Sequence, residues 1–451
     1  AENKYFRGGA KLTTARESQL LVQVGPGTAM GDLMRQYWIP AAKSSELLAD
    51  GDPLRLLLLG EKLIAFRDSS GRIGVLDHRC PHRCASLFFG RNEQDGLRCV
   101  YHGWKYDIDG NCVDMPNMSP KEDFKEKIKA KAYKTKERNG LIWVFMGNQE
   151  SLPPLPQLEP TLLEEGEARI FFTMRECNWL QALEGDIDTS HFSFLHGGSL
   201  KIDQVPDDNP GKYQLVDRAP GYHVSKMDWG TMYGAYRPTE DPDQLYWRVA
   251  HFLFPFWTMP PDGDFDNHIV ARAWVPMDDT HTMFVHLSWM QNTQGLRVDR
   301  NGDPLPGIVL GMEYLPNKDD WYGRWRLAAN GTNNYMIDRK AQRDGDIYTG
   351  ITGIHLQDQA ITESMGPITD HEWEHLAPSD RMITLTRRTL VQTAQAFAKD
   401  RKPPPGVKNP DLFLAARSGD FLAHKNVDWM DAYWNRIRSS ANPTGRLRTA
   451  G

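Results

Sequence analysis

The 451-residue sequence has few of the features that would place it in a specialised class. Its five cysteines are too few for the disulfide scaffold of a small secreted domain. Its formal net charge of −6 gives no basic excess, which argues against nucleic acid as a partner. The longest aliphatic run is Leu56–Leu59, far short of the roughly 20 apolar residues that span a bilayer, and AENKYFRGGAKLTT holds no apolar stretch typical of a secretory signal. We therefore expect a cytoplasmic protein without a membrane span.

The composition is that of an ordinary globular protein, with 40% hydrophobic and 25% charged residues. Residues 54–148 alternate short apolar stretches with turn residues, which predicts a first domain made only of strands. The proline-rich segment 152–156 interrupts any regular element and marks a boundary. We expect an N-terminal segment at 1–45 that packs on the body, a β domain at 46–150 and a second domain at 151–451.

The second domain has a different pattern, in which helical and strand signals are mixed. Helices are expected at 176–196, 354–365 and 380–399, and long strands within 246–290. A long-stranded sheet with helices packed against it is typical of an α+β fold.

Clustered cysteines and histidines in the first domain indicate a metal site. Cys80 and His82 form a C-x-H pair, and Cys99 and His102 form a C-x2-H pair 16 residues later. One tetrahedral zinc could take all four side chains, but C-x-H is a tight spacing for two ligands of one ion. Two sulfide-bridged irons suit the pattern better, with both cysteines on one iron and both histidines on the other, which is the Rieske [2Fe-2S] arrangement.

The strings CPHRCASL and CVYHGW resemble the Rieske domains of ring-hydroxylating oxygenases. Respiratory-type Rieske subunits are an alternative, but they carry an extra cysteine in each motif, joined as a disulfide. Here the second motif has Val100 and Tyr101, so Cys84 lacks a partner of that kind. The oxygenase family usually has glycine at the position of Cys84. We interpret Cys84, Cys112 and Cys177 as small packing residues.

A second group of candidate ligands lies in NWLQALEGDIDTSHFSFLH, which holds two histidines and three carboxylates. On a helix, Asp188 and His191 would share one face, and His196 would lie at or beyond its end. Two histidines and a distant carboxylate can form the facial triad of a mononuclear iron(II) oxygenase. Taken alone, an HxxxxH pattern more often marks histidines that bind no metal.

The combination of both motifs resembles Rieske non-haem iron oxygenases over roughly residues 20–400. The resemblance implies that His191 and His196 bind a mononuclear Fe(II), and that Asp188 bridges between His191 and the Rieske ligand His102 of a neighbouring subunit. It places the third ligand in GIHLQDQAITESM, where Asp358 is favoured over His355 and Glu363. It also implies a helix-grip (START-like) catalytic sheet. Glu184 and Asp186 are left open, as solvated groups or as groups that contact the ligands.

The strings VGPGTAMGDLMRQYWIP and CVDMPN resemble the phthalate-dioxygenase-like branch, which oxidises aromatic acids by ring hydroxylation or oxidative O-demethylation. We expect the segment 218–290 to form the wall of the substrate pocket through its aromatic residues Tyr222, Trp229, Tyr233, Phe252 and Phe254. Basic candidates for a substrate carboxylate are Arg218, Lys226, Arg237 and Arg248, because arginine offers a bidentate fork to a carboxylate.

The chain lacks a GxGxxG fingerprint and a plant-type four-cysteine ferredoxin run. We therefore expect a terminal oxygenase component that consumes dioxygen and takes electrons from a separate NAD(P)H-dependent reductase, with or without a ferredoxin. The family's bridge between subunits implies a homotrimer or a pair of stacked trimers. The competing interpretation is a Rieske electron-transfer or binding protein without oxygenase chemistry.

Overall fold

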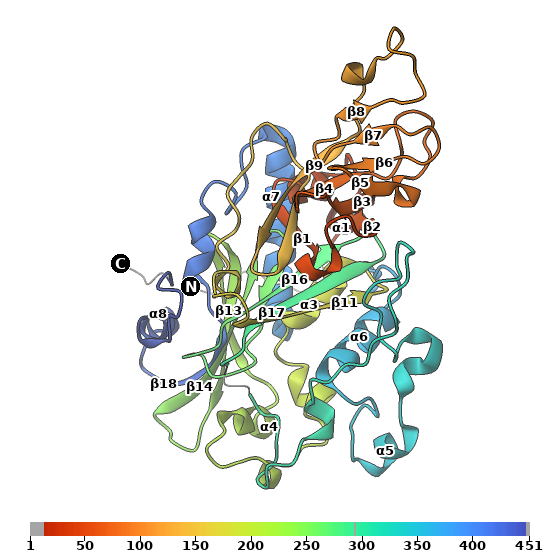
Figure 1. Cartoon of the computed structure of the whole chain (residues 1–451). Helices are drawn as coiled ribbons and strands as arrows, with labels where there is room; N and C mark the ends of the chain where they lie inside the picture. The colour runs from red at the N-terminus through yellow and green to blue at the C-terminus, as the bar shows by residue number, and fades with distance from the viewer. Residues whose placement is uncertain (1–12, 293–294, 448–451) are drawn as a thin grey trace.

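The computed structural model describes residues 13–292 and 295–447. The chain forms an all-β domain at one end of the molecule and a larger α+β body (Figure 1). This confirms the predicted fold class. The division of the chain at residue 150 stays a prediction.

The β domain contains two small antiparallel sheets. The six-stranded sheet has the order β1-β10-β9-β4-β3-β2, and its strands are β1 (Trp38–Lys43), β2 (Leu54–Leu58), β3 (Glu61–Arg67), β4 (Ile73–Asp77), β9 (Ala132–Arg138) and β10 (Leu141–Phe145). The four-stranded sheet, in the order β5-β6-β7-β8, consists of β5 (Arg91–Glu93), β6 (Gly96–Arg98), β7 (Lys105–Tyr106) and β8 (Cys112–Asp114). The loops that carry the Cys/His motifs flank this smaller sheet: one precedes β5 and the other joins β6 to β7.

The body is built on an eight-stranded antiparallel sheet in the order β11-β17-β16-β15-β14-β13-β12, with β18 paired to β14. Its strands are β11 (Ala168–Arg175), β12 (Gly221–Met227), β13 (Gly230–Pro238), β14 (Gln244–Leu253), β15 (Trp257–Met259), β16 (Val270–Pro276), β17 (Thr282–Trp289) and β18 (Gly419–His424). The long strands expected within 246–290 are confirmed as β14, β16 and β17.

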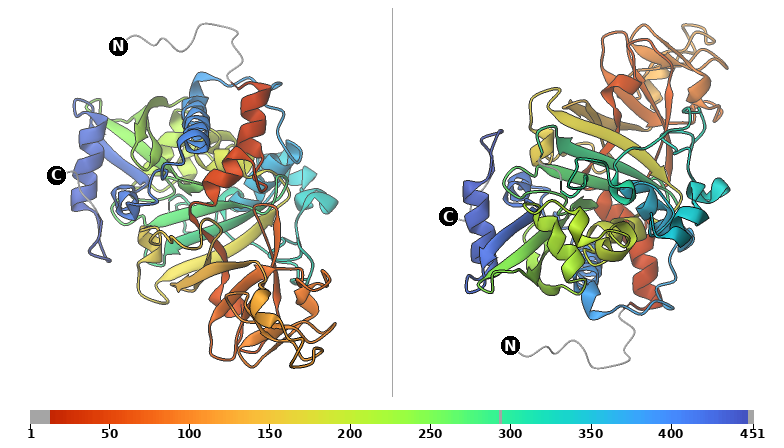
Figure 2. Two further views of the ribbon diagram at one scale, coloured as in Figure 1. Left: turned by 90° about the horizontal axis from the view of Figure 1, so that it is seen from above. Right: turned by 90° about the horizontal axis from the view of Figure 1, so that it is seen from below.

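Helices cover this sheet and connect the two parts of the chain. They are α1 (Ala15–Val22), α2 (Ala29–Met34), α3 (Trp179–Asp186), α4 (Tyr213–Val216), α5 (Arg339–Asp344), α6 (Ile354–Ser364), α7 (Arg381–Asp400) and α8 (Trp429–Ser439). The helices predicted at 354–365 and 380–399 are confirmed as α6 and α7. The N-terminal helices α1 and α2 lie beside α7 (Figure 2), and β1 continues into the six-stranded sheet. Among the described residues, no helix is long and apolar enough to cross a membrane.

The helix predicted at 176–196 is wrong in its second half. Helix α3 ends at Asp186, and a separate π-helical turn, η5, covers Phe192–His196. The Asp188 carboxylate accepts a hydrogen bond from the Ser190 backbone N–H at 2.8 Å, and this local bond competes with continuation of the helix. Asp188 and His191 therefore belong to the connecting turn.

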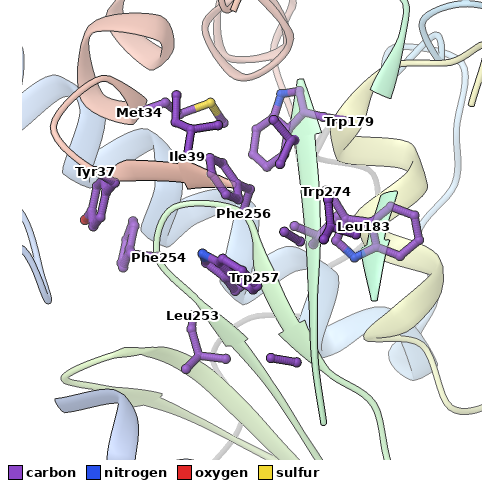
Figure 3. Packing of buried hydrophobic residues seen from close by; sticks show 14 of the residues in the cluster. Met34, Tyr37, Ile39, Trp179, Leu183, Leu253, Phe254, Phe256, Trp257 and Trp274 are labelled. Atoms are coloured by element: carbon purple, nitrogen blue, oxygen red, sulfur yellow. The ribbon is translucent and has the colours of Figure 1, made fainter. Parts of the chain in front are cut away.

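Aromatic packing fixes the position of α3 (Figure 3). Trp179 and Leu183 pack among side chains from the N-terminal segment and from β14–β16, including Ile39, Trp257 and Trp274. Burying each such side chain contributes roughly 1.5–3 kcal/mol. The turn that carries His191 thus starts from a rigid part of the core.

Candidate functional site

The two Cys/His motifs of the β domain form loops of the same shape. The backbone N–H of Cys84 donates to the carbonyl of Cys80 at 2.9 Å, and the N–H of Gly103 donates to the carbonyl of Cys99 at the same distance. Both closing residues have a left-handed backbone, with φ of +62° at Cys84 and +80° at Gly103. The two loops therefore present their side chains in matching ways.

The four predicted cluster ligands converge at the tips of these loops. Cys80 and Cys99 are buried, while the rings of His82 and His102 are half-buried with centroids 4.3 Å apart. The Tyr106 hydroxyl lies 3.2 Å from Cys80 Sγ. Hydrogen bonding from Cys99, opposed by burial and aided by Tyr106, holds the pKa of the Cys80 thiol below its ordinary value. Two buried sulfurs and two half-buried imidazoles are a donor set that would hold a [2Fe-2S] cluster.

The interpretation of Cys84 as a packing residue is wrong, because its side chain is exposed. Its left-handed backbone explains why glycine suits this position, since a Cβ atom is disfavoured there. Cys112 and Cys177 are buried within hydrophobic clusters, as predicted.

In the body, His191, His196 and Asp358 bring three ligand atoms together. The two Nε2 atoms are 3.1 Å apart, and Asp358 Oδ1 lies 3.1 Å from His196 Nε2 and 3.7 Å from His191 Nε2. Ligands about 2.1 Å from one metal and at right angles to each other are about 3.0 Å apart. Two of the three separations have the spacing of one face of an octahedron, and the third, between Asp358 and His191, is wider. Two histidines and a carboxylate grouped in this way are the donor set of the facial non-haem iron sites.

Neighbouring groups orient both imidazoles toward this point. Gln357 donates through its amide nitrogen to the Ile351 carbonyl at 2.7 Å, so its Oε1 accepts from His196 Nδ1 at 2.6 Å. His191 Nδ1 faces the Asp188 carboxylate at 3.5 Å. Each Nε2 lone pair is therefore left for a metal. Burial would raise the pKa of Asp188, but hydrogen bonds from His191 and Ser190 keep it below its ordinary value.

Helix α6 supplies the third side chain because it is bound to α3. Gln181 of α3 donates to the carbonyls of Thr362 and Gly366, both at 2.8 Å. The competing candidates on α6 lie elsewhere: His355 lines a neighbouring cavity, and Glu363 accepts hydrogen bonds from Tyr335, Gln359 and the Glu176 backbone.

The two carboxylates left open by the sequence both form ion pairs with arginines. Glu184 is bound to Arg387 at 2.6 Å, with side-chain exposures of 11% and 5%. Asp186 is bound to Arg272 at 2.6 Å and accepts a hydrogen bond from Thr258. Neither group is solvated, and both tie the turn after α3 to its surroundings.

A cavity of about 230 Å³ lies beside the triad. Asp262 and Arg272 line both this cavity and the pocket that contains His191, His196 and Asp358, so the two are neighbours. The other polar side chains of the cavity come from strands β11 and β17, from helix α6 and from adjacent loops: Arg169, His268, His286, Ser288, Asn292, Arg297, Tyr314 and His355.

The prediction that residues 218–290 form the pocket wall is right only for the second half of that segment, in which the cavity-lining residues begin at Asp262. The expected aromatic residues do not line the cavity: Trp229, Tyr233, Phe252 and Phe254 belong to the hydrophobic core, and Tyr222 packs against it. The arginines of the cavity were missed by sequence reasoning. A signal was present at Arg272, which interrupts the otherwise apolar run Ile269–Met277.

The four basic candidates have different surroundings. Arg248 lines the triad pocket and donates to Thr189 at 2.8 Å. Arg237 is fully buried and donates to the Asp217 carbonyl, and Arg218 lies over the ring of Phe194. Lys226 is exposed on β12. Of the four, only Arg248 is placed beside the triad.

The sequence matches two protein families that together span most of the chain. Residues 37–134 match the Rieske [2Fe-2S] domain, and residues 144–443 match the family described as LigXa C-terminal domain like. The first match decides between the cluster and the zinc alternative. The fold is shared with the caffeine-bound QL mutant of NdmA from Pseudomonas putida CBB5, with a TM-score of 0.53 and 18% identity over 89% of this chain and 100% of that one.

Two curated relatives extend over nearly the whole chain. The 3-chlorobenzoate-3,4-dioxygenase oxygenase subunit of Comamonas testosteroni is 51% identical over 94% of this chain and 99% of its own length. The phthalate 4,5-dioxygenase oxygenase subunit of Pseudomonas putida is 35% identical over 93% and 94%. These similarities decide against a mere electron carrier. The chain is an oxidoreductase that belongs to the phthalate-dioxygenase-like branch of the Rieske non-haem iron oxygenases.

Proposed function

We propose that this chain is a terminal oxygenase that oxidises an aromatic acid with dioxygen. In this proposal Cys80, His82, Cys99 and His102 hold the [2Fe-2S] cluster, and His191, His196 and Asp358 hold Fe(II). When bound, the cluster supplies single electrons and the Fe(II) supplies activation of dioxygen. The observation that supports it most is the grouping of the three ligand atoms next to a cavity lined by arginines.

The protein's own residues perform the remaining tasks. Gln357 and Asp188 hold the two imidazoles in their metal-binding tautomers, and the buried ion pairs of Glu184 and Asp186 fix the turn that carries them. Phe171, Met312 and Tyr314 give the cavity apolar surface for an aromatic ring. Three protein ligands on one side leave the opposite side open to dioxygen and substrate.

The reaction favoured by the two relatives is dioxygenation of the ring. One dioxygen, two electrons and two protons convert the arene into a dihydrodiol that carries both oxygen atoms. Oxidative O-demethylation is the second candidate, in which one oxygen atom leaves in water and the methyl group leaves as formaldehyde. Oxygen uptake with benzoate, 3-chlorobenzoate, phthalate and a methoxybenzoate, together with product and formaldehyde analysis, separates the two reactions.

Replacement of Asp358 with alanine tests the metal assignment. We expect the iron content to fall from about three to about two per chain, because the Rieske cluster stays while the facial triad loses its carboxylate. Turnover should disappear while the visible spectrum of the cluster persists. The matched variant Glu363→Ala, on the same helix but outside the triad, should keep all three irons. Retained iron and activity in the Asp358 variant would refute the assignment.

We further propose that a separate reductase feeds the cluster and that electrons then cross between subunits of a trimer. In Figures 1 and 2 the β domain lies at one end of the molecule, away from α6. Exposed apolar side chains lie near His102 and near Asp188. Val100 and Tyr101 directly precede His102, and Ile361 and Met365 line a groove that contains Asp188. These two surfaces are suited to meet in adjacent copies, which would bring His102 of one copy toward Asp188 of the next.

Subunit complementation tests this arrangement directly. A Cys80→Ser chain lacks the cluster and an Asp358→Ala chain lacks the mononuclear iron, so each homo-oligomer should be inactive. Co-expressed heteromers should regain activity, because an intact cluster then faces an intact iron site across a subunit interface. Inactive heteromers of normal size and iron content would show that the transfer occurs within one chain. Mass photometry gives the oligomeric state independently.

A further inference from the structure

Three adjacent strands form one wall of the cavity in two rows of side chains. Because alternate residues of a strand share a face, the register places Arg169 of β11, Ser288 of β17 and Val270 of β16 in one row. The next row contains Phe171, His286 and Arg272 from the same strands. The rows are about 6.6 Å apart, since two residues of a strand advance the chain by that distance.

The two rows differ in their distance from the triad. Arg272 also lines the pocket that holds His191, His196 and Asp358, so its row is the inner one. Arg169 is solvent-exposed, so its row lies at the opening of the cavity. A molecule that enters from solvent therefore passes Arg169 first.

The charges of the inner arginines are compensated. Arg272 is paired with Asp186 at 2.6 Å. Arg297 donates to both carboxylate oxygens of Asp262, at 2.6 and 2.5 Å. Two carboxylates thus balance two guanidinium groups. Arg169 has no carboxylate partner within residues 13–292 and 295–447, which leaves one uncompensated positive charge at the opening.

The middle of the wall is neutral and flat. His286 lies parallel to Phe171, with ring centroids 4.4 Å apart and an angle of 16°. Its Nδ1 accepts a hydrogen bond from Arg272 Nε at 3.2 Å, and an arginine can only donate. Burial and the nearby Arg272 lower the pKa of His286 well below its ordinary value, so the ring is neutral with its hydrogen on Nε2.

We propose that the substrate carboxylate binds Arg169, assisted by the Ser288 hydroxyl, while its aromatic ring lies over Phe171 and His286. This inference rests on the proposed function. A benzoate-like molecule has about the length that separates the two rows, so its far edge reaches Arg272 and Asp262 and points to the triad. The ring carbons remote from the carboxylate are then the ones oxidised, and the carboxylated carbon and its neighbours are not.

The experiment compares an acid with its uncharged amide on the holoenzyme. The acid is whichever of benzoate, 3-chlorobenzoate and phthalate the wild type oxidises fastest, and calorimetry gives Kd for both compounds. Arg169→Gln should weaken binding of the acid about 10-fold or more, because a charge-assisted hydrogen bond is lost, and leave the amide within about twofold. Arg169→Lys should retain most of the discrimination. Arg300→Gln, an exposed arginine outside the cavity, should change neither value.

The products give a second readout. The wild type should place both hydroxyl groups on carbons that neither carry nor adjoin the carboxylated carbon, and Arg169→Gln should give a mixture of isomers. Unchanged discrimination in Arg169→Gln, or a wild-type product hydroxylated at the carboxylated carbon, would overturn the inference while the proposed function stands. A wild type that binds and oxidises none of the acids would refute the proposed function and this inference together.

Discussion

Replacing Tyr106 with phenylalanine removes one hydroxyl group from the surroundings of the Rieske cluster. Tyr106 is fully buried on β7, and its hydroxyl lies 3.2 Å from Cys80 Sγ. A cysteine that binds iron as a thiolate can only accept, so Tyr106 is the donor. The cluster gains negative charge when it is reduced, and the hydrogen bond is then stronger. Its loss should therefore make the cluster harder to reduce.

The size of this effect follows from the energy of one hydrogen bond. A buried neutral hydrogen bond contributes about 0.5–1.5 kcal/mol. For a one-electron couple, about 1.4 kcal/mol corresponds to about 59 mV. If most of the bond energy distinguishes the two redox states, Tyr106→Phe lowers the reduction potential by about 20–65 mV.

A redox titration of the purified oxygenase, followed by visible circular dichroism or by the EPR signal of the reduced cluster, measures this shift. The matched control is Tyr133→Phe in the same domain, because the buried Tyr133 hydroxyl donates to Glu61 at 2.6 Å and not to a sulfur. The control should stay within about 10 mV of the wild type, which is small beside the shift expected for one lost bond. A raised potential, or equal shifts in both variants, would refute the reasoning.

Three further predictions concern stability. Arg387→Met leaves the buried Glu184 carboxylate without its partner and should lower the free energy of unfolding by about 3–5 kcal/mol in urea titrations; an unchanged midpoint would contradict this. Cys84→Gly relieves a left-handed backbone and should stabilise the cluster-bearing domain by about 1 kcal/mol, seen as later thermal bleaching of the cluster absorbance, whereas earlier bleaching would speak against it. Burial raises the pKa of Asp420 to about 7, above about 3.9 for an unfolded chain, so its ionisation destabilises the fold. Its contribution is most favourable below pH 4 and declines by on the order of 4 kcal/mol as the pH rises to 7; Asp420→Asn should remove this decline, and identical pH profiles of unfolding would disprove it.

The sequence by itself determined the features that depend on short spacing. Cys80 and His82, like Cys99 and His102, lie within one loop each, so a few residues suffice to fix which side chains can share a cluster. The same holds for His191 and His196. The long apolar segments on either side of a turn-rich stretch likewise predicted β14, β16 and β17, and the helical patterns of residues 354–365 and 380–399 predicted α6 and α7.

Other features were decided only by tertiary structure. Asp358 is 162 residues from His196, and only its family resemblance singled it out until the hydrogen bonds from Gln181 showed how α6 meets α3. The end of α3 at Asp186 was missed for a different reason, because the hydrogen bond from the Ser190 N–H to the Asp188 carboxylate is local but competes with an otherwise helical pattern. The left-handed backbone and the exposure of Cys84 also could not be read from its neighbours in the sequence.

The cavity shows this division most clearly. Arg169, Arg272 and Arg297 come from two non-adjacent strands and a loop, and the sequence gives no local sign that they share one space. The positive charges of Arg272 and Arg297 are balanced by the carboxylates of Asp186 and Asp262, which belong to other segments of the chain. Local spacing therefore predicted the four cluster ligands and the two histidines of the second centre. The net charge of the cavity depends on residues from distant segments, which only the fold brings together. The proposed orientation of a substrate depends on the same residues.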